Sequence, residues 1–230
     1  MTRSDAQRSA LLDAAERLFA EEGISGVSDR RIAADAGHRN HSAVAYHFGG
    51  RAGLLEALVE RHTRELHDSM RDRLERSDSV LDDVRALVLP TTDALDALPW
   101  PSWRARFLAT LVDDPQTREL ARTNLELSPL ASAVVRSALS RLTELDPAVA
   151  QGRARLMVWM VVNTCADVER APQRPDWRAV GAFLSDAIAG MLQAPSSQER
   201  SVGARRAAVA GRGTMARAHE PAGGPSDPPG

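Results

Sequence analysis

Hydrophobic residues recur along most of the chain at the three- and four-residue spacing of helices, and strand-like alternation is scarce. The first helical segment begins at a capping-box pattern, Ser4 with Gln7, and ends at Gly23. Leu11 and Leu18 mark its apolar face. Aromatic residues make up only 4% of the chain. The pattern predicts an all-α protein of about nine helices.

Two short helices are predicted next. Ser28 is a candidate N-cap for the second helix, which ends at Gly37, and Asn40 is a candidate N-cap for the third. The third helix carries Val44 and Phe48 and is followed by a Gly-Gly pair. Two short helices joined by a tight turn are typical of a helix-turn-helix, which delivers the start of its second helix into a DNA major groove.

The remainder, as far as about residue 194, consists of longer helical segments separated by breaks, several of which contain proline. Their expected ranges are 51–77, 80–98, 103–112, a helical turn or two within 117–127, 129–145, 147–169 and 176–192. We therefore expect a small three-helix domain over residues 1–50 and a larger helical domain over residues 51–194.

The last segment, residues 195–230, is dominated by Ser, Gly, Pro, Ala and Arg. Such a composition buries too little apolar surface to offset the entropy of ordering, so we expect a disordered tail. Its dispersed arginines indicate either an auxiliary attraction for DNA or an inert extension.

The formal net charge is −2, so the chain has no overall excess of basic residues that would indicate a nucleic-acid partner. Residues 1–60 hold seven Arg and nine Asp or Glu, so a DNA-binding surface would have to be local. All 29 basic residues are Arg, for which a GC-rich genome is the plain explanation. Arginine still forms bidentate contacts to guanine and phosphate that lysine does not.

Several function classes find no support in the residues. Cys165 is the only cysteine, which rules out an intramolecular disulfide and a CxxC-type zinc site. His38 and His41 lie three apart with no obvious third ligand, so no metal is expected. No nucleophile elbow and no Gly-rich phosphate loop are present, so neither catalytic residues nor a cofactor are expected. The first 22 residues lack a signal-peptide core, and the longest apolar run has eleven residues, so a soluble cytoplasmic protein is expected.

Three segments together, ERLFAEEG, RIAADAG and YHFGGRAGLLEAL, followed by an all-helical remainder, resemble the tetracycline-repressor (TetR) family of bacterial transcriptional regulators. The resemblance covers about residues 8–60. It implies a homodimer on double-stranded DNA with a pseudo-palindromic operator, and a C-terminal domain that binds a small-molecule effector. The most direct expectation is a repressor that the effector releases from its operator.

The resemblance, together with the position of the predicted third helix, indicates which residues contact DNA. These are Ser28, Arg39, Asn40, His41, Ser42, Ala43, Tyr46, His47 and Arg51. The stretch from Gly37 to Phe48 is one residue longer than the commoner family spacing, and Ala45 stands where the family commonly has an aromatic residue.

Within the larger domain, an effector cavity is expected to be mainly apolar. Its candidate lining is Trp100, Trp103, Phe107, Leu111, Met157 and Met160, with Asn163 as a polar group. For any one of these residues, ordinary core packing is the alternative. The run 156–162 is apolar on all sides, so it must be buried in a core or against a second subunit. A four-helix dimer interface is therefore expected from Leu156, Trp159 and Val162 with Phe183, Ala187, Ile188 and Met191.

One alternative remains open at this point. The acidic first helix favours a helical protein-interaction module that binds no DNA. DNA binding is weakened by salt because phosphate contacts release counterions, so binding that is insensitive to salt would support the alternative. An enzyme would instead require a pocket with convergent ionisable groups.

Overall fold

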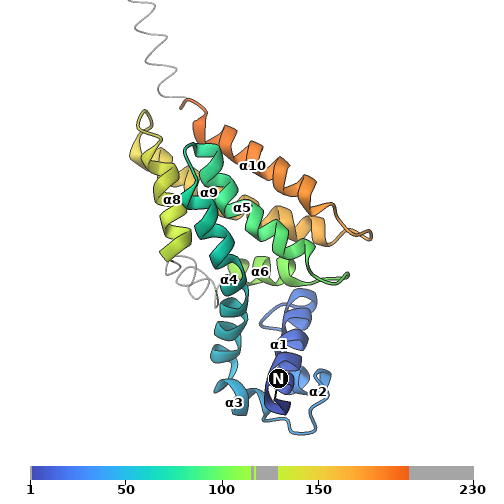
Figure 1. Cartoon of the computed structure of the whole chain (residues 1–230). Coiled ribbons are helices and arrows are strands. Elements are labelled where there is room, and N and C mark those ends of the chain that lie inside the picture. The colour runs from blue at the N-terminus through green and yellow to red at the C-terminus, as the bar shows by residue number, and fades with distance from the viewer. Residues whose placement is uncertain (1, 115–116, 118–128, 197–230) are drawn as a thin grey trace, which may run out of the picture. The chain divides into compact units, whose positions relative to one another are not determined.

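The computed structural model describes residues 2–114, 117 and 129–196 (Figure 1). Within these ranges the chain forms helices and no strands, which confirms the all-α prediction. The helices are α1 (Arg3–Glu22), α2 (Asp29–Asp35), α3 (Ala43–Phe48), α4 (Arg51–Glu75), α5 (Val80–Asp96), α6 (Arg104–Asp113), α8 (Pro129–Ser140), α9 (Pro147–Glu169) and α10 (Trp177–Gln193). All of them belong to one compact unit, residues 1–193. The predicted turns within 117–127 and the tail beyond residue 196 lie almost wholly outside the described residues.

In the described ranges no helix combines the length and the apolar character that crossing a membrane requires.

The ends of α1 are set by a capping box and a glycine. The Thr2 hydroxyl accepts a hydrogen bond from the Asp5 backbone N–H at 3.1 Å, and the Thr2 N–H donates to the Asp5 carboxylate at 2.8 Å. The predicted box at Ser4 and Gln7 is therefore wrong, because the helix begins earlier and both residues lie inside it. At the other end, Gly23 adopts a φ of 81°, which stops the helix as predicted.

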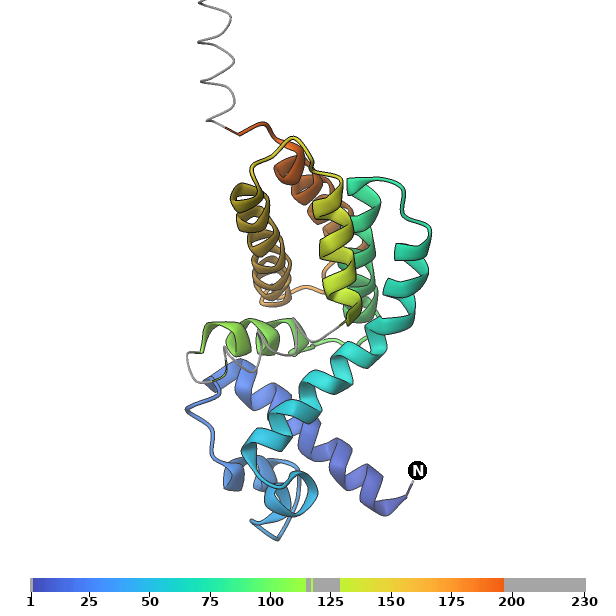
Figure 2. The ribbon, with the colours of Figure 1, turned by 90° about the vertical axis from the view of Figure 1, so that its left-hand side faces the viewer.

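The first hydrophobic core lies beneath the short helices. Leu11, Leu18 and Phe19 of α1 are buried against α2, α3 and the first half of α4. Phe107 of α6 belongs to the same core and stacks on Phe19 with ring centroids 6.1 Å apart. Figure 2 shows α6 lying across the end of α1. The core that supports the short helices therefore includes a helix from much later in the chain.

The second core is formed mainly by α5, α9 and α10, with α8 at its edge. Trp177, Leu184 and Ile188 of α10 are fully buried there. A Cβ on Gly181 would lie 2.6 Å from the Thr92 hydroxyl oxygen of α5. The lack of a side chain at this position is what lets α10 pack so closely on α5.

Helix α6 contacts both cores, and a buried carboxylate fixes its first turn. The Glu169 side chain at the end of α9 is fully buried and accepts hydrogen bonds from the Ser102 hydroxyl at 2.7 Å and the Arg106 N–H at 2.9 Å. The N-cap residue of α6, Trp103, makes no side-chain capping bond. Glu169 therefore caps α6 from another helix, where its charge also complements the helix dipole.

A buried ionic cluster joins α6 to α1 and α4. Glu16 of α1 pairs with Arg61 of α4, and the Arg104 Nε of α6 lies 4.0 Å from the Glu16 carboxylate. Arg104 also pairs with Glu65. The His62 Nε2 lies 3.1 Å from Glu16 without a well-directed hydrogen bond.

The pKa values of two groups in this cluster follow from burial and neighbouring charge. Burial lowers the pKa of His62 more than the nearby Glu16 carboxylate raises it. Burial tends to raise the pKa of Glu16, but His62, Arg61 and Arg104 outweigh it, so that the net shift is downward. Near neutral pH the cluster therefore holds an ionised Glu16 and a neutral His62.

Candidate nucleic-acid interface

The turn between α2 and α3 is held by backbone hydrogen bonds. The Ser28 hydroxyl caps α2 by accepting from the Arg31 N–H at 3.2 Å, as predicted. After α2, the Gly37 N–H donates to the Ala34 carbonyl at 3.1 Å, and the His38 N–H donates to the Ala33 carbonyl at 2.9 Å. Gly37 has a φ of 75°, which favours glycine and turns the chain away from the axis of α2.

The start of α3 differs from the prediction. Its N-cap residue is Ser42, and no side chain caps the helix there. Asn40 instead accepts a hydrogen bond from the Ser42 N–H at 2.9 Å through its side-chain oxygen. An asparagine that bonds the backbone two residues ahead closes a turn within the loop. Asn40 is therefore not the N-cap of α3.

Helix α3 divides into a buried and an exposed face. Ala43 and Val44 pack into the first core and are 3% and 0% exposed. Tyr46 is 82% exposed, which is exceptional for a large aromatic side chain. Its ring contacts that of His47 edge to face at a centroid distance of 4.9 Å, and His47 lies 6.0 Å from His38. Ala43 therefore cannot offer its side chain to a groove, whereas Tyr46 can.

The loop before α3 adds further exposed polar groups. Arg39, Asn40, His41 and Ser42 are all exposed, and Arg39 has no carboxylate within ion-pair distance among the described residues. They lie at the end of the molecule that carries α2 and α3, the lower end in Figure 1. The exposed loop, Tyr46 and the half-buried His47 lie on and just before α3, and we call them together the reading surface (residues 39–42, 46 and 47).

Arg51, at the first position of α4, is engaged within the protein. Its guanidinium pairs with Asp29 of α2 at 3.0 Å, donates to the Ile24 carbonyl and lies 4.7 Å from the Phe19 ring centroid. The side chain is half-buried. Arg51 therefore holds α2 and α4 together, and the phosphate contact expected of it would have to compete with these bonds.

Glycines permit the sharp junction between α3 and α4. Gly49 has a φ of 73° and Gly50 a φ of 118°, both in the region that favours glycine. A Cβ on Gly53 would lie only 2.0 Å from the Phe48 carbonyl oxygen. The first turn of α4 thus rests directly on the end of α3 and fixes its orientation.

The carboxylates of the first 60 residues are largely neutralised within the protein. Glu21 and Asp35 pair with Arg17, and Glu22 lies 3.6 Å from Arg31. The remaining ion pairs of this region involve Asp13, Glu16, Asp29 and Glu60. Four arginines make no such pair in the described ranges: Arg3, Arg8, Arg30 and Arg39. The local basic character that DNA binding needs is therefore present although the net charge is negative.

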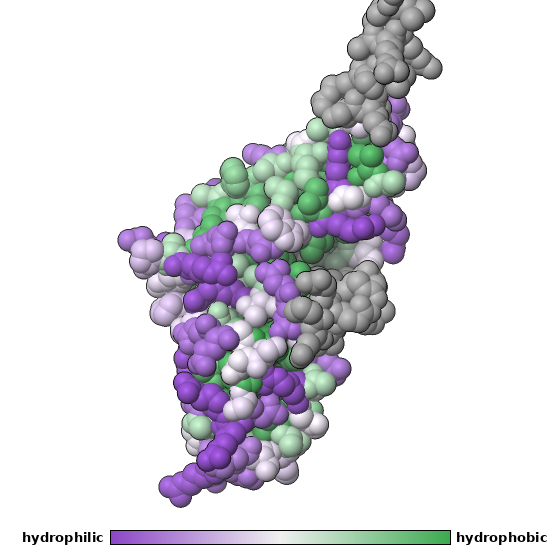
Figure 3. Space-filling model, turned by 180° about the vertical axis from the view of Figure 1, so that it is seen from behind, coloured by the Kyte–Doolittle hydropathy of each residue, from purple (hydrophilic) through white to green (hydrophobic). Residues whose placement is uncertain are grey.

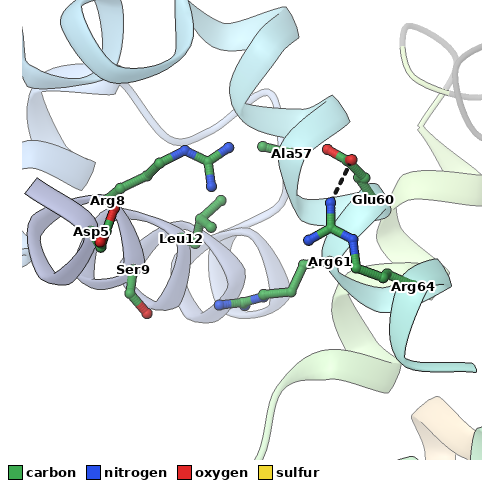
Figure 4. A pocket seen from close by; sticks show the side chains of 8 residues that line it. All are labelled: Asp5, Arg8, Ser9, Leu12, Ala57, Glu60, Arg61 and Arg64. Carbon is green, nitrogen blue, oxygen red and sulfur yellow. Dashed lines mark hydrogen bonds and ion pairs between the residues drawn. The ribbon is translucent and has the colours of Figure 1, made fainter. Parts of the chain in front are cut away.

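Arg8 is a candidate contact that the sequence pattern did not single out. Its guanidinium lies 4.8 Å from the centroid of the Phe48 ring, beside the end of α3. Figure 4 shows Arg8 reaching over a hollow of about 270 Å³ between α1 and α4, where Arg64 pairs with Glu60. Only the tertiary contact with Phe48 places Arg8 near α3.

The buried residues among those expected to line an effector cavity are divided between the two cores. Phe107 and Leu111 pack into the first core, whereas Met157 and Met160 belong to the second. The Trp103 indole N–H donates to Glu21 of α1 at 3.1 Å, the Asn163 amide donates to the Trp159 carbonyl of its own helix at 3.1 Å, and Trp100 is half-buried. Helices α6 and α9, which carry most of these residues, pack against each other, and a cavity lined by this group stays a prediction.

Most residues expected at a dimer interface are at the surface. Leu156, Trp159 and Phe183 are 51%, 55% and 66% exposed, and Val162, Ala187 and Met191 are half-buried. Ile188 is fully buried inside its own protomer and cannot contribute. In Figure 3, which views the side that carries α9, hydrophobic residues gather over the upper half and hydrophilic residues dominate the lower end.

No group of three potential metal-ligating side chains occurs in the described part of the chain. Burial, reinforced by Glu169, raises the pKa of the Cys165 thiol to about 12. The thiol is therefore protonated and unreactive near neutral pH.

Two short helices, α2 and α3, joined by a tight turn and followed by an all-helical remainder are the architecture of a helix-turn-helix regulator. A family model described as bacterial regulatory proteins, tetR family, matches residues 11–58. The uncharacterized HTH-type transcriptional regulator Rv1255c of Mycobacterium tuberculosis is 30% identical over 161 residues, which cover 70% of this chain and 75% of that protein. The chain therefore belongs to the TetR family: it is a transcriptional regulator and not an enzyme.

Solved structures show the same fold. Mycobacterium smegmatis AmtR has a TM-score of 0.56 at 20% identity and covers 86% of this chain and 89% of its own. PfmR, a TetR-family regulator from Thermus thermophilus, has a TM-score of 0.54 at 19% identity over 77% of this chain and 96% of its own. At these identities the likeness concerns architecture alone.

Proposed function

We propose that this regulator is a homodimeric repressor that binds a specific operator and is released from it by a small molecule. The observation that carries the proposal is the exposed reading surface on and before α3, with Tyr46 82% exposed and Arg39 unpaired within the described residues. An exposed aromatic and a free guanidinium beside a helix start suit contacts to base edges and phosphates. On this proposal residues 1–50 bind DNA, and residues 51–194 form the effector-binding and dimerisation domain.

The proposed DNA contacts are a refinement of those expected from the sequence. They comprise Ser28, Arg39, Asn40, His41, Ser42, Tyr46 and His47, with Arg8 added. Ala43 is omitted because it is buried, and Arg51 positions α2 and α4 without being free to reach a phosphate.

The proposed dimer forms through the exposed apolar face of α9 and α10. Leu156, Trp159 and Phe183 are large hydrophobic side chains at the surface, and a second copy of the chain would cover them. Two helices from each protomer would then make a four-helix interface. The two reading surfaces of such a dimer would address half-sites whose centres lie about 34–36 Å apart, on a pseudo-palindromic operator.

The first test is binding of the purified full-length protein to the DNA that flanks its own gene, at two salt concentrations and with excess unrelated DNA. The proposal expects tight binding that competitor DNA does not abolish and that weakens as salt rises. If a folded dimer selects no sequence from that DNA or from a randomised operator library, the proposal fails. The family membership sets aside the protein-interaction module as the main alternative.

The effector part of the proposal is separate and rests on family analogy. It expects a small molecule to lower the affinity of the dimer for its operator, and it places the protein in the cytoplasm with the chromosome. A screen that finds only compounds without effect on a verified operator complex would count against it.

A further inference from the structure

A hollow of about 760 Å³ lies over the outer face of α5, between the last turns of α4 and the first half of α10. We call it the α5 trough. Leu89 and the buried Thr92 of α5 line its floor, and Ala182 and the buried Ser185 line its α10 side. Its size falls within the range of about 300–1,000 Å³ that is usual for small-molecule sites.

The side of the trough toward solvent is rich in guanidinium groups. Arg73 and Arg76 at the end of α4, Arg85 of α5 and Arg178 of α10 all line it. The guanidinium of Arg73 pairs with Asp93 at 3.1 Å. Four cations from three helices thus converge on one hollow.

The carboxylates in the trough do not balance these cations. Arg85 lies 3.7 Å from Asp82, whose carboxylate also accepts a hydrogen bond from Ser79. Arg76 and Arg178 make no ion pair within the described ranges, and the lining holds three carboxylates (Asp82, Asp93 and Asp186) against four arginines. The lining therefore carries an excess of positive charge, which an anion would neutralise.

The position of Arg178 is not explained by helix stability. Cations are favoured in the last turn of a helix, which accounts for Arg73 and Arg76 at the end of α4. Arg178, however, is the second residue of α10, where the helix dipole disfavours a positive charge. A basic residue held against this preference at the mouth of a hollow is consistent with a ligand-binding role.

We infer that the α5 trough binds a small organic polyanion that bears carboxylate or phosphate groups. Arg76 and Arg178 would each form a fork of hydrogen bonds to an oxyanion, since the guanidinium geometry matches carboxylate and phosphate oxygens. Leu89 and Ala182 would contact the carbon skeleton between the charged groups. The hydroxyls of Thr92 and Ser185 already donate to helical carbonyls of their own helices and keep only acceptor positions, so the arginines provide the recognition.

Such a ligand would link α4, whose first turn supports α3, to α10. This step rests on the proposed function: the bound anion would fix the end of α4 and thereby change the affinity for the operator. The binding step itself does not depend on DNA.

The experiment titrates inorganic pyrophosphate and, separately, citrate into the full-length protein by calorimetry, at constant ionic strength in a phosphate-free buffer. The inference expects saturable binding of at least one probe, at about one per chain, and the preferred probe distinguishes phosphate from carboxylate chemistry. The double variant Arg76→Gln/Arg178→Gln should bind at least about tenfold more weakly, because charge-assisted hydrogen bonds are lost.

The matched control is Arg64→Gln/Arg71→Gln, which removes the same charge from exposed positions of α4 outside the trough and should bind as the wild type does. A third variant, Ala182→Glu, adds a carboxylate at an exposed helical position and should abolish binding while every arginine remains. No saturable binding of either probe, or equal losses in both double variants, would overturn the inference.

The link to DNA is measured separately, as operator affinity with and without the bound probe. An unchanged operator affinity at saturation would overturn the coupling. Failure to find any operator would count against the proposed function. The calorimetric titration would still show whether the α5 trough binds an anion.

Discussion

At the scale of single residues, the reading surface depends on side chains that the fold leaves at the surface without an ion pair. Tyr46 and Arg39 are free in this sense, whereas Arg51, only a few residues further on, is bound to Asp29 and Ile24. Sequence proximity to α3 therefore does not decide which arginines can reach DNA. What distinguishes the two arginines in the structure is that Arg51 is ion-paired.

Replacing Arg39 by alanine should weaken operator binding about tenfold, equivalent to about 1.4 kcal/mol, because one guanidinium contact is lost. If that contact is to a phosphate, the slope of log affinity against log salt should fall by about one. The measurement is a DNA titration at several salt concentrations. Arg71→Ala, at an exposed position of α4 paired only with acids of its own helix, is the control and should leave affinity unchanged. Equal effects of the two changes would contradict the placement of the reading surface.

Replacing Gly53 by alanine should disturb the junction of α3 and α4. The new Cβ would meet the Phe48 carbonyl at 2.0 Å, so the backbone must move, at a cost of about 1–3 kcal/mol in the free energy of unfolding. Operator affinity should fall as well, since α3 is reoriented. Denaturant unfolding and DNA titration measure the two effects.

The control for Gly53 is Gly152→Ala in α9, where an added Cβ meets nothing within 4 Å. Alanine there should raise stability by about 0.5–1 kcal/mol through helix propensity. A Gly53 variant as stable and as active as the wild type would show that the close approach to Phe48 is absent in solution.

At the scale of helices, carboxylates from three other helices hold the first turn of α6. Glu169 of α9 caps its first turn, and Arg104 reaches Glu16 and Glu65. The same helix contributes Phe107 to the core beneath α2 and α3. The position of α1 is therefore tied through α6 to the end of α9.

Replacing Arg104 by methionine should lower the free energy of unfolding by about 3 kcal/mol. The change removes a cation from a buried cluster and leaves Glu16 less compensated, which is the costly way to break a buried ion pair. Arg170→Met, which breaks an exposed pair with Asp167, should change stability by no more than about 0.5 kcal/mol. Urea unfolding of both variants measures the two changes in the free energy of unfolding. Similar decreases in the two variants would argue against a buried cluster.

Stability should also fall in mild acid because of His62 and Glu16. The folded-state pKa of His62 is lowered, so the unfolded chain binds its proton more readily and stability is lost as pH falls below about 6.5. The lowered pKa of Glu16 adds a further loss at lower pH, as the folded carboxylate becomes protonated. The thermal midpoint should therefore decline below about pH 6.5.

His62→Gln should reduce the decline of the thermal midpoint just below about pH 6.5, where His62 contributes. His67→Gln, at an exposed position of the same helix, should leave the decline unchanged. A midpoint that rises as pH falls below neutrality would contradict the assignment of a neutral, buried His62.

The helices were largely predictable because their ends carry local signals. Gly23 and Ser28 act as the sequence indicates, and Pro147 begins α9 as expected. Asn40 was assigned wrongly because an asparagine can close a turn as readily as it can cap a helix, and sequence does not distinguish the two. The lining of an effector cavity is harder to predict from sequence for another reason. The face that α6 turns toward α1 is decided by packing between distant segments, as the contact of Phe107 with Phe19 shows.

At the scale of the whole molecule, the proposed dimer should depend on the apolar face of α9 and α10. Trp159→Glu places a charge on an exposed tryptophan at that face and should convert the dimer to a monomer with unchanged helical content. Analytical ultracentrifugation and circular dichroism measure the two properties. Operator binding should weaken strongly, since two half-sites are no longer engaged together.

Arg71→Glu, which also introduces a negative charge but lies on exposed α4, should remain dimeric. If the Trp159→Glu protein is still a dimer, the dimer interface lies on another face of the molecule.

The length of α4 gives the molecule a simple mechanical property. Its 25 residues span about 37 Å, with Arg51 anchored beside α2 at one end and Arg73 at the α5 trough at the other. If α4 tilts by about 5° about its end at the α5 trough, atoms one helical turn from that end move by about half an ångström. The opposite end, beside α3, moves by about 3 Å. That displacement is close to the rise of about 3.4 Å between successive base pairs. A tilt of α4 that is small at the α5 trough would therefore displace α3 by about the length of one base-pair step.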